Sequence, residues 1–353
     1  MKRKIHNPTR RKHTQTKKKT NLFSCNNSLL WTWNLGFLCG TILTIQIITG
    51  IALSMKYETT TAFQNINIQE KYSNLWIPRR IHSIGTTTYF IGLYLHIIRS
   101  HIHQNMKNSS GWSGIIIFIL SLVIALLGYS LSNGNMAFWA LTVMTSLFTN
   151  LPEGDFILSI ITGNYEINNT ILPRILTVHF LLGITLPIIV YWHTSEVHKN
   201  ESNTDLGTRG VLTGKDFINT GIQKDILFIP IIGYFIIWGF QEESKLHKLI
   251  EDNNTNDWIQ KNRTPEPIGP EWYVLPFFIG LKTTNLIGLI IGIIFILLNI
   301  NKNIKRWNII TYWLCFFILG DLALEAHESL LEPRVILFTV MMLTLSGTLL
   351  TYS

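Results

Sequence analysis

Four histidines in two apolar segments are the residues whose type and spacing most strongly suggest chemistry. Residues 82–96 (HSIGTTTYFIGLYLH) and 179–193 (HFLLGITLPIIVYWH) carry no Asp, Glu, Lys or Arg, and each begins and ends with a histidine. On an α-helix this separation of fourteen residues spans about 21 Å and falls about 40° short of whole turns. The two histidines of each segment therefore share one helix face, with an imidazole near either end.

Neutral imidazoles that face each other across a helix bundle are natural axial ligands of b-type haem iron. With the two segments parallel, His82 pairs with His179 and His96 pairs with His193, which predicts two haems stacked across a bilayer. The alternative is that intramembrane histidines hydrogen-bond to a neighbouring helix or relay protons. Because the same spacing occurs on two helices, we favour haem ligation.

Two pairs of glycines repeat the histidine spacing. Gly36 and Gly50 are fourteen residues apart, and so are Gly114 and Gly128. A porphyrin plane beside a helix needs a backbone without a Cβ, although glycine is also common at contacts between membrane helices. Two glycine pairs with the spacing of the histidines favour a role in haem binding.

Two arginines lie near the ends of the first histidine segment. Arg79 comes three residues before His82, and Arg99 comes three residues after His96. Their guanidinium groups can meet haem propionates, and the alternative is that they reach lipid phosphates. The three cysteines have no CxxC or CxxCH spacing, which argues against covalent haem attachment, an iron–sulfur cluster or a disulfide framework.

The elements that must position these residues are membrane helices. The chain has 353 residues, of which 47% are hydrophobic and only 14% are charged, whereas soluble domains carry roughly 25% charged residues. A bilayer core needs about 20 apolar residues per helix, and uncharged runs of this kind recur along the chain. We predict an all-α membrane protein in which the first four of eight transmembrane helices form a bundle around the two haems. The predicted helices are 32–55, 78–103, 113–132, 173–198, 224–241, 272–300, 309–326 and 334–352.

The charge distribution predicts the topology. Residues 1–20 contain nine of the 29 Lys and Arg residues and none of the 21 acidic residues. Eight crossings place both termini on one side, which the positive-inside rule identifies as the cytoplasmic or matrix side. We interpret the basic block as a retained tail facing lipid rather than a transit peptide or a nucleic-acid-binding segment. The predicted domains are a matrix-side basic tail (1–30), a dihaem four-helix bundle (31–223) and the remaining helices (224–353).

These features resemble mitochondrial cytochrome b, the dihaem membrane subunit of the quinol:cytochrome c oxidoreductase of respiratory complex III. The resemblance implies that the low-potential haem near the intermembrane space is held by His82 and His179. It likewise implies that His96 and His193 hold the high-potential haem near the matrix. Besides the histidines and glycines, the matching motifs are WNLG at 33–36, GY at 128–129, FW at 138–139, KDIL at 224–227 and PEWY at 270–273.

The resemblance also implies two quinone sites. His198, Lys224 and Asp225 match the quinone-reduction site of the family, where they can exchange protons with a quinone. A solvated histidine and a charged helix start are the alternatives. Glu271 within PEWY would accept a proton from quinol, with Tyr273 beside the pocket, whereas an acid in the first turn of a helix is the alternative.

The sequence departs from the family in the segment after GY. The family usually reads VLPWGQMSFWGA, whereas residues 130–141 read SLSNGNMAFWAL, so that Asn135 replaces a glutamine and Leu141 a small residue. Position 282 holds Lys where Arg is usual. We expect Leu141 to narrow the quinol pocket opposite Glu271 and to weaken inhibitors that reach deep into it.

The function predicted from these features is that of an enzyme subunit. Quinol is oxidised on the intermembrane side and quinone is reduced on the matrix side, with electron transfer through two bis-histidine haems coupled to proton translocation (a Q cycle). The alternative is a non-redox polytopic transporter or structural subunit whose histidines relay protons. The implied setting is a dimeric complex of the mitochondrial inner membrane, in which the partners are the Rieske iron–sulfur protein and cytochrome c1. The implied substrates are ubiquinol and ubiquinone. Anionic lipid such as cardiolipin is also expected to bind, and nucleic acid is not.

Overall fold

The computed structural model describes residues 35–62, 76–102, 109–149, 152–163 and 170–199, with single positions between 226 and 313. Within these residues every regular element is a helix. In chain order they are α1 (Leu35–Ser54), α3 (Trp76–Ile102), α4 (Ser109–Ser130), α5 (Asn135–Thr149), α6 (Gly154–Thr162) and α7 (Ile171–Lys199).

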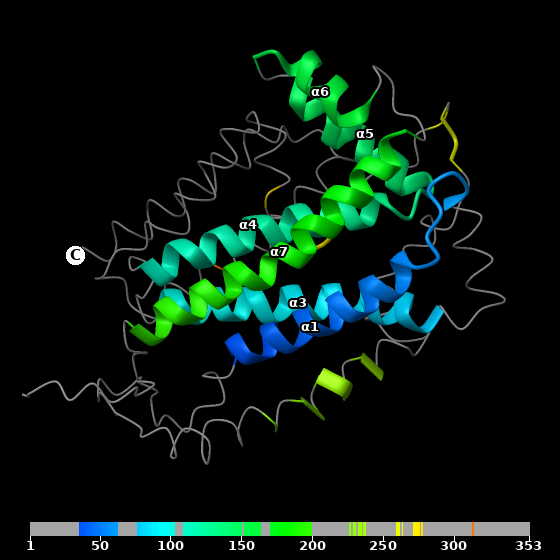
Figure 1. Cartoon of the computed structure of the whole chain (residues 1–353). Helices are drawn as coiled ribbons and strands as arrows, with labels where there is room; N and C mark the ends of the chain where they lie inside the picture. The colour runs from blue at the N-terminus through cyan, green and yellow to red at the C-terminus, as the bar shows by residue number, and fades with distance from the viewer. Residues whose placement is uncertain are drawn as a thin grey trace, which may run out of the picture.

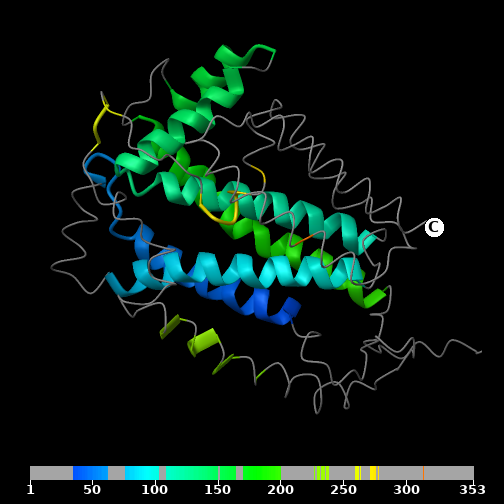
Figure 2. The same ribbon diagram turned by 180° about the vertical axis from the view of Figure 1, so that it is seen from behind.

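The four long helices α1, α3, α4 and α7 lie side by side as a bundle (Figure 1). Helix α1 packs mainly on α3, and α4 packs mainly on α7, so the bundle consists of two helix pairs. Helices α3 and α7 run in the same direction, as the sequence predicts, and α1 and α4 run in the opposite direction (Figures 1 and 2). This arrangement brings the first turns of α3 and α7 to the end of the bundle where α5 and α6 lie.

Three of the described helices, α1, α4 and residues 171–198 of α7, are long and apolar enough to cross a membrane. Helix α3, which we also predict to span, lies alongside them over a similar length (Figure 2). It falls outside this set because its arginines, histidines and threonines lower its hydropathy. Helix α3 instead supplies much of the core, through Tyr89, Phe90, Leu93, Tyr94 and Ile97.

Helix α7 shows the opposite pattern, since much of its apolar surface is exposed. The exposed fraction is 59% for Leu181, 67% for Ile188 and 77% for Tyr191. Large apolar side chains are stable in such positions when lipid rather than water surrounds them. This face of α7 therefore fits a bilayer-facing surface.

The segment 133–172, which connects the predicted helices 113–132 and 173–198, contains α5 and α6. Helix α6 ends at Gly163, whose φ of 75° is left-handed, and the backbone N–H of Gly163 donates to the carbonyl of Ser159. Arg174 of α7 donates a hydrogen bond to the carbonyl of Ile160. A guanidinium beside the last carbonyls of a helix is favourable, and it fastens α6 to α7.

The predicted helices beyond residue 223 are described only at scattered positions. Residue 226 and seven other positions up to 237 are helical, in line with the segment 224–241. Single helical positions also fall within 272–300 and 309–326. The segments 1–34 and 334–352 lie outside the described residues.

Candidate functional site

The four histidines face each other across the bundle in the two pairs expected from their spacing. The ring centroids of His82 and His179, here named the outer pair, are 6.5 Å apart with an interplanar angle of 71°. Those of His96 and His193, the inner pair, are 6.4 Å apart with an angle of 78°. The outer pair lies at the end of the bundle where α5 and α6 lie. Each pair thus joins α3 to α7 at a nearly equal separation.

Hydrogen bonds fix the ring orientation at three of the four histidines. The Nδ1 atom of His179 lies 2.9 Å from the carbonyl oxygen of Ile124, to which it donates. The Nδ1 atom of His82 lies 2.9 Å from Oγ1 of Thr49, a hydroxyl that itself donates to the carbonyl of Ile45. Since a carbonyl only accepts, and a hydroxyl that has donated its proton can only accept, both Nδ1 atoms carry the proton.

The third hydrogen bond has the same form. The Nδ1 atom of His193 lies 2.8 Å from Oγ of Ser113, and that hydroxyl donates to the carbonyl of Ser110. In a neutral imidazole with its proton on Nδ1, the lone pair for a metal is on Nε2. The hydrogen bonds therefore prepare these three rings to coordinate through Nε2.

The four glycines lie directly against the four histidine rings. A Cβ added to Gly50 would lie 3.3 Å from Cε1 of His82, and one added to Gly128 would lie 2.8 Å from Cε1 of His179. The closest atom to an added Cβ is Cε1 of His96 for Gly36 and Cε1 of His193 for Gly114, at 3.4 and 3.3 Å. We expected the glycines to make room for a porphyrin plane. In the structure the immediate neighbour of each is a histidine ring, which it allows to lie close to the opposing helix.

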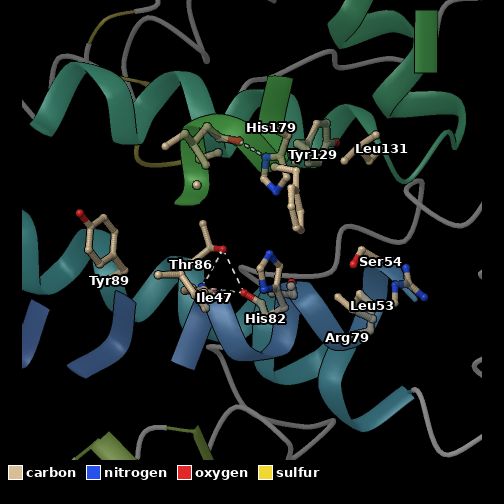
Figure 3. A pocket seen from close by; sticks show the side chains of 18 of the residues that line it. Ile47, Leu53, Ser54, Arg79, His82, Thr86, Tyr89, Tyr129, Leu131 and His179 are labelled. Carbon is tan, nitrogen blue, oxygen red and sulfur yellow. Dashed lines mark hydrogen bonds between the residues drawn. The ribbon is translucent and has the colours of Figure 1, made fainter. Parts of the chain in front are cut away.

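A cavity of about 560 Å³ surrounds the outer pair. His82 of α3 and His179 of α7 point into it from opposite sides, with Tyr129 beside His179 (Figure 3). Arg79 and Arg80 line it at the end near α5. This volume lies within the roughly 300–1,000 Å³ of pockets that bind organic cofactors.

At the mouth of the cavity, Tyr57 joins α1 to α4. Its phenol donates a 2.6 Å hydrogen bond to the carbonyl of Leu131. Burial raises the pKa of the Tyr57 phenol, so it stays a donor at neutral pH. Tyr57 and Leu131 both line the cavity, so this bond joins the end of α1 to the end of α4 beside it.

The geometry of both pairs fits a six-coordinate haem iron. Two iron–nitrogen bonds of about 2 Å, with about 1 Å from each nitrogen to its ring centre, require a centroid separation of about 6 Å. Both observed separations are close to this value. Within the described residues no group of three or more His, Cys, Asp or Glu side chains can hold a bare metal ion. The donor set of two neutral imidazoles suits a metal whose other ligands come from a macrocycle.

The segment that carries Glu271 is fixed against α3. The ring of Tyr273 stacks on Phe90 with centroids 4.2 Å apart and an interplanar angle of 2°, and its carbonyl accepts a hydrogen bond from Tyr94. The indole of Trp272 contacts Oγ1 of Thr87 at 3.5 Å. Glu271 and Tyr273 both line the cavity of the outer pair, so this carboxylate and phenol share a space with His82 and His179.

Leu141 does not lie where we expected. It is buried in a cluster with Ala62, Ile171, Leu172 and Ile175, and neither it nor Ala140 is among the residues that line the cavity shared by Glu271. The reason is helical periodicity, because Leu141 lies one turn after the buried Ala137 on the side of α5 that faces the start of α7. The expectation that Leu141 narrows the pocket opposite Glu271 is wrong.

Asn135, the other unusual residue of this segment, has a structural role at the start of α5. It is 5% exposed, and its Oδ1 accepts a 3.0 Å hydrogen bond from the backbone N–H of Gln260. The Lys261 ammonium lies 6.0 Å from the centre of the Phe138 ring. These contacts fasten residues near 260 to α5.

The predicted quinone-reduction residues are only partly visible. His198 is half-buried in the last turn of α7, five residues beyond His193, which places it at the inner end of the bundle. Arg99 lies at the same end, in the last turn of α3. Lys224 and Asp225 lie outside the described residues.

Sequence reasoning did not identify Thr49 and Ser113 as functional residues. Each directly precedes one of the four spaced glycines, at Thr49–Gly50 and Ser113–Gly114, and the hydroxyl lies against the same ring as the glycine. A search for hydroxyl residues next to the spaced glycines would have found both. The carbonyl of Ile124 could not be found in this way, because every residue carries one.

Comparisons with known proteins show which family the sequence resembles. Residues 20–201 match the family described as Cytochrome b/b6/petB. The chain is 32% identical over 278 residues to cytochrome b of Zymoseptoria tritici, which covers 75% of this chain and 70% of that protein. It is 33% identical over 287 residues to cytochrome b of Apis mellifera ligustica, with 78% and 74% covered. To cytochrome b of Mycosarcoma maydis it is 28% identical over 330 residues, with 86% and 82% covered.

The fold is also similar to that of a solved structure. A chain of a structure titled Hyperthermophilic respiratory Complex III superposes with a TM-score of 0.73 over 97% of each chain. The two sequences are 18% identical. The arrangement of helices is therefore shared even though most side chains differ.

Proposed function

The chain belongs to the cytochrome b family, and from that membership and the histidine geometry we propose that it carries electrons across a membrane between two b-type haems. The outer pair, His82 and His179, holds one haem, and the inner pair, His96 and His193, holds the other. When bound, the haems supply one-electron redox chemistry and a path for electrons along the bundle. The observation that carries the proposal is the equal separation of the two histidine pairs, 6.5 and 6.4 Å.

The surrounding residues bind and orient the haems. Gly36, Gly50, Gly114 and Gly128 let the histidine rings lie close to α1 and α4. Arg79 at the outer end and Arg99 at the inner end bind propionates, since guanidinium groups pair well with carboxylates.

Quinol oxidation takes place at the outer end. Glu271 and Tyr273 line the cavity that contains the outer histidines, so a quinol head group bound next to the outer haem would be within reach of both a proton acceptor and an electron acceptor. Glu271 accepts a proton from the quinol hydroxyl, and Tyr273 forms the adjacent wall.

Quinone reduction takes place at the inner end. His198, at the end of α7, with Lys224 and Asp225 of the following segment, delivers protons to the two quinone oxygens. The support is the position of His198 at the end of the bundle where the inner pair lies, together with the match of KDIL (224–227) to the family. The bilayer offers no other proton source there.

Family membership supports a proposal for the wider setting. The chain is the core subunit of a dimeric quinol:cytochrome c oxidoreductase with an iron–sulfur protein and cytochrome c1, and its two quinone sites translocate protons in a Q cycle. It lies in the mitochondrial inner membrane, with anionic lipid such as cardiolipin around the basic tail (1–30) on the matrix side. Residues 31–223 form the dihaem bundle, and residues 224–353 carry PEWY.

The decisive experiment is a reduced-minus-oxidised absorption spectrum of the assembled complex, with the same spectrum for single histidine variants. Wild type shows two b-type haems. His82→Ala or His179→Ala removes one haem, and His96→Ala or His193→Ala removes the other. His101→Gln is the matched control, because His101 is a buried histidine of α3 that contacts Trp313 instead of a histidine, and Gln keeps an acceptor for the Trp313 indole. A wild-type spectrum without haem bands overturns the proposal in favour of a non-redox membrane protein.

A further inference from the structure

Three of the four histidine rings lie on their glycines in the same way. A Cβ added to Gly50 would be 3.3 Å from Cε1 and 3.8 Å from Nδ1 of His82. For Gly114 and His193 the two distances are 3.3 and 3.7 Å, and for Gly36 and His96 they are 3.4 and 3.9 Å. The three glycines therefore lie at nearly the same distances from their imidazoles, which makes the residues that precede them comparable positions.

The residue that precedes the glycine is polar at Gly50 and Gly114 but apolar at Gly36, which lies at the inner end of α1. It is Thr49 before Gly50 and Ser113 before Gly114, and both hydroxyls accept a hydrogen bond from Nδ1 of the adjacent histidine. Before Gly36 it is Leu35, fourteen residues ahead of Thr49 and 4% exposed. A leucine at this place offers no acceptor.

The consequence is visible at His96. Its Nδ1 atom is buried and has no hydrogen-bond partner among the residues that the structure describes. The fourth ring, His179, also faces a glycine preceded by leucine, Leu127, but its Nδ1 donates to the carbonyl of Ile124 instead. His96 is thus the one ligand of the four, within the described residues, whose Nδ1 donates to nothing.

The hydrogen-bond partner at Nδ1 of a ligating imidazole changes the redox properties of the metal that the other ring nitrogen, Nε2, binds. When Nδ1–H donates to an acceptor, the imidazole becomes more electron-rich and a stronger ligand. A more electron-rich ligand favours the oxidised form of haem iron and lowers its reduction potential. Among the described residues, two arginines lie at the outer end (Arg79 and Arg80) and one lies at the inner end (Arg99), so these cations do not raise the potential of the inner haem above that of the outer haem.

We propose that Leu35, by leaving Nδ1 of His96 without an acceptor, raises the reduction potential of the inner haem and so biases electrons from the outer pair toward the inner pair. Both outer rings donate from Nδ1, whereas only one inner ring does, which gives the inner haem the less electron-rich ligand set. Leu35 is a positioning residue, because it acts only through His96. The inference rests on the proposed function, in which the two pairs hold haems.

The test is a redox titration of the assembled complex, following the two haems by their absorption bands. Leu35→Thr places a hydroxyl where Thr49 has one, and it lowers the midpoint potential of the inner haem alone. The expected change is roughly tenfold in the reduction equilibrium, or about 59 mV for one electron. Leu35→Val, which has the shape of threonine without the hydroxyl, leaves both midpoints unchanged.

The reciprocal variant tests the same rule at the outer end. Thr49→Val removes the acceptor of His82 while keeping the side-chain shape, and it raises the midpoint of the outer haem by a similar factor. Leu127→Thr is the matched control, since it adds a hydroxyl before Gly128 beside a histidine already bonded to Ile124. It leaves both midpoints at their wild-type values.

Two results overturn the inference. One is an unshifted inner midpoint in Leu35→Thr when the spectrum shows that both haems are bound. The other, decisive even if Leu35→Thr fails to assemble, is an unshifted outer midpoint in Thr49→Val. Both results leave the proposed function standing, whereas a wild-type complex without haem bands removes the proposed function itself.

Discussion

The phenol of Tyr94 on α3 donates a 2.6 Å hydrogen bond to the backbone carbonyl of Tyr273, which is 179 residues further along the chain. Tyr94 is 3% exposed and Tyr273 4%, so water does not compete for this bond. It fixes the segment that carries Glu271 against the bundle at the height of Phe90 and Tyr94. The position of the proposed proton acceptor relative to the outer pair therefore depends on a side chain of α3.

Tyr94→Phe should loosen this attachment. The substitution keeps the ring but leaves a buried carbonyl unsatisfied, which costs about 1–3 kcal/mol. We expect a lower thermal unfolding temperature and slower quinol-driven haem reduction, measured by stopped-flow absorption, with both haems still bound. Tyr89→Phe is the control, because among the described residues the Tyr89 phenol bonds to Ser121 and not to the Tyr273 carbonyl. Equal losses in the two variants would assign the effect of Tyr94 to general packing.

Gly128→Ala should disturb the outer pair more than any alanine at the other three spaced glycines. Its Cβ would lie 2.8 Å from Cε1 of His179, closer than unstrained atoms allow, whereas the Cβ at Gly36 would lie at 3.4 Å. Overpacking of this kind costs about 1–3 kcal/mol. We expect partial loss or a shifted spectrum of the outer haem in Gly128→Ala, measured as haem per protein. Gly40→Ala on α1 meets nothing within 4 Å and should bind both haems normally.

Leu141→Ala should act on stability rather than on the quinol pocket. Removing a buried leucine from the cluster with Ile171, Leu172 and Ile175 leaves a cavity, which typically costs about 2–5 kcal/mol. The complex should unfold at a lower temperature, while inhibitors of quinol oxidation keep their affinity once the folded fraction is accounted for. A selective gain in inhibitor affinity without loss of stability would restore the expectation that Leu141 lines the pocket.

Glu271→Gln should slow proton transfer from quinol. The amide keeps the size of the side chain but cannot accept the proton, and loss of a general base typically costs at least about 10²-fold in rate. Stopped-flow reduction of the outer haem by quinol, with quinone reduction blocked by an inhibitor, measures this step. Glu153→Gln is the matched control, an exposed acid before α6 at the same end of the bundle. A rate of Glu271→Gln within a few-fold of wild type would contradict the assigned role.

Several parts of the fold and site can be predicted from the sequence because they follow from helix periodicity. A separation of fourteen residues returns to nearly the same face of a helix, so the spacing of His82 and His96 is enough to place both rings toward one neighbour. The parallel course of α3 and α7 follows from counting crossings, and together they give the pairing of the rings. The helix boundaries were less well predicted, since α4 begins at Ser109 rather than 113, where polar residues extend it beyond the apolar run.

What the sequence determined by itself is the set of groups that repeat along each helix, namely the four histidines and the four glycines. What only the tertiary structure decided is which group meets which across the bundle. The hydroxyl of Thr49 reaches His82, the carbonyl of Ile124 reaches His179, and Leu141 turns toward α7, because these contacts depend on the rotation and separation of neighbouring helices. Periodicity along one helix contains no information about that rotation, so the difference between His96 and the other three histidines emerges only once the helices are packed.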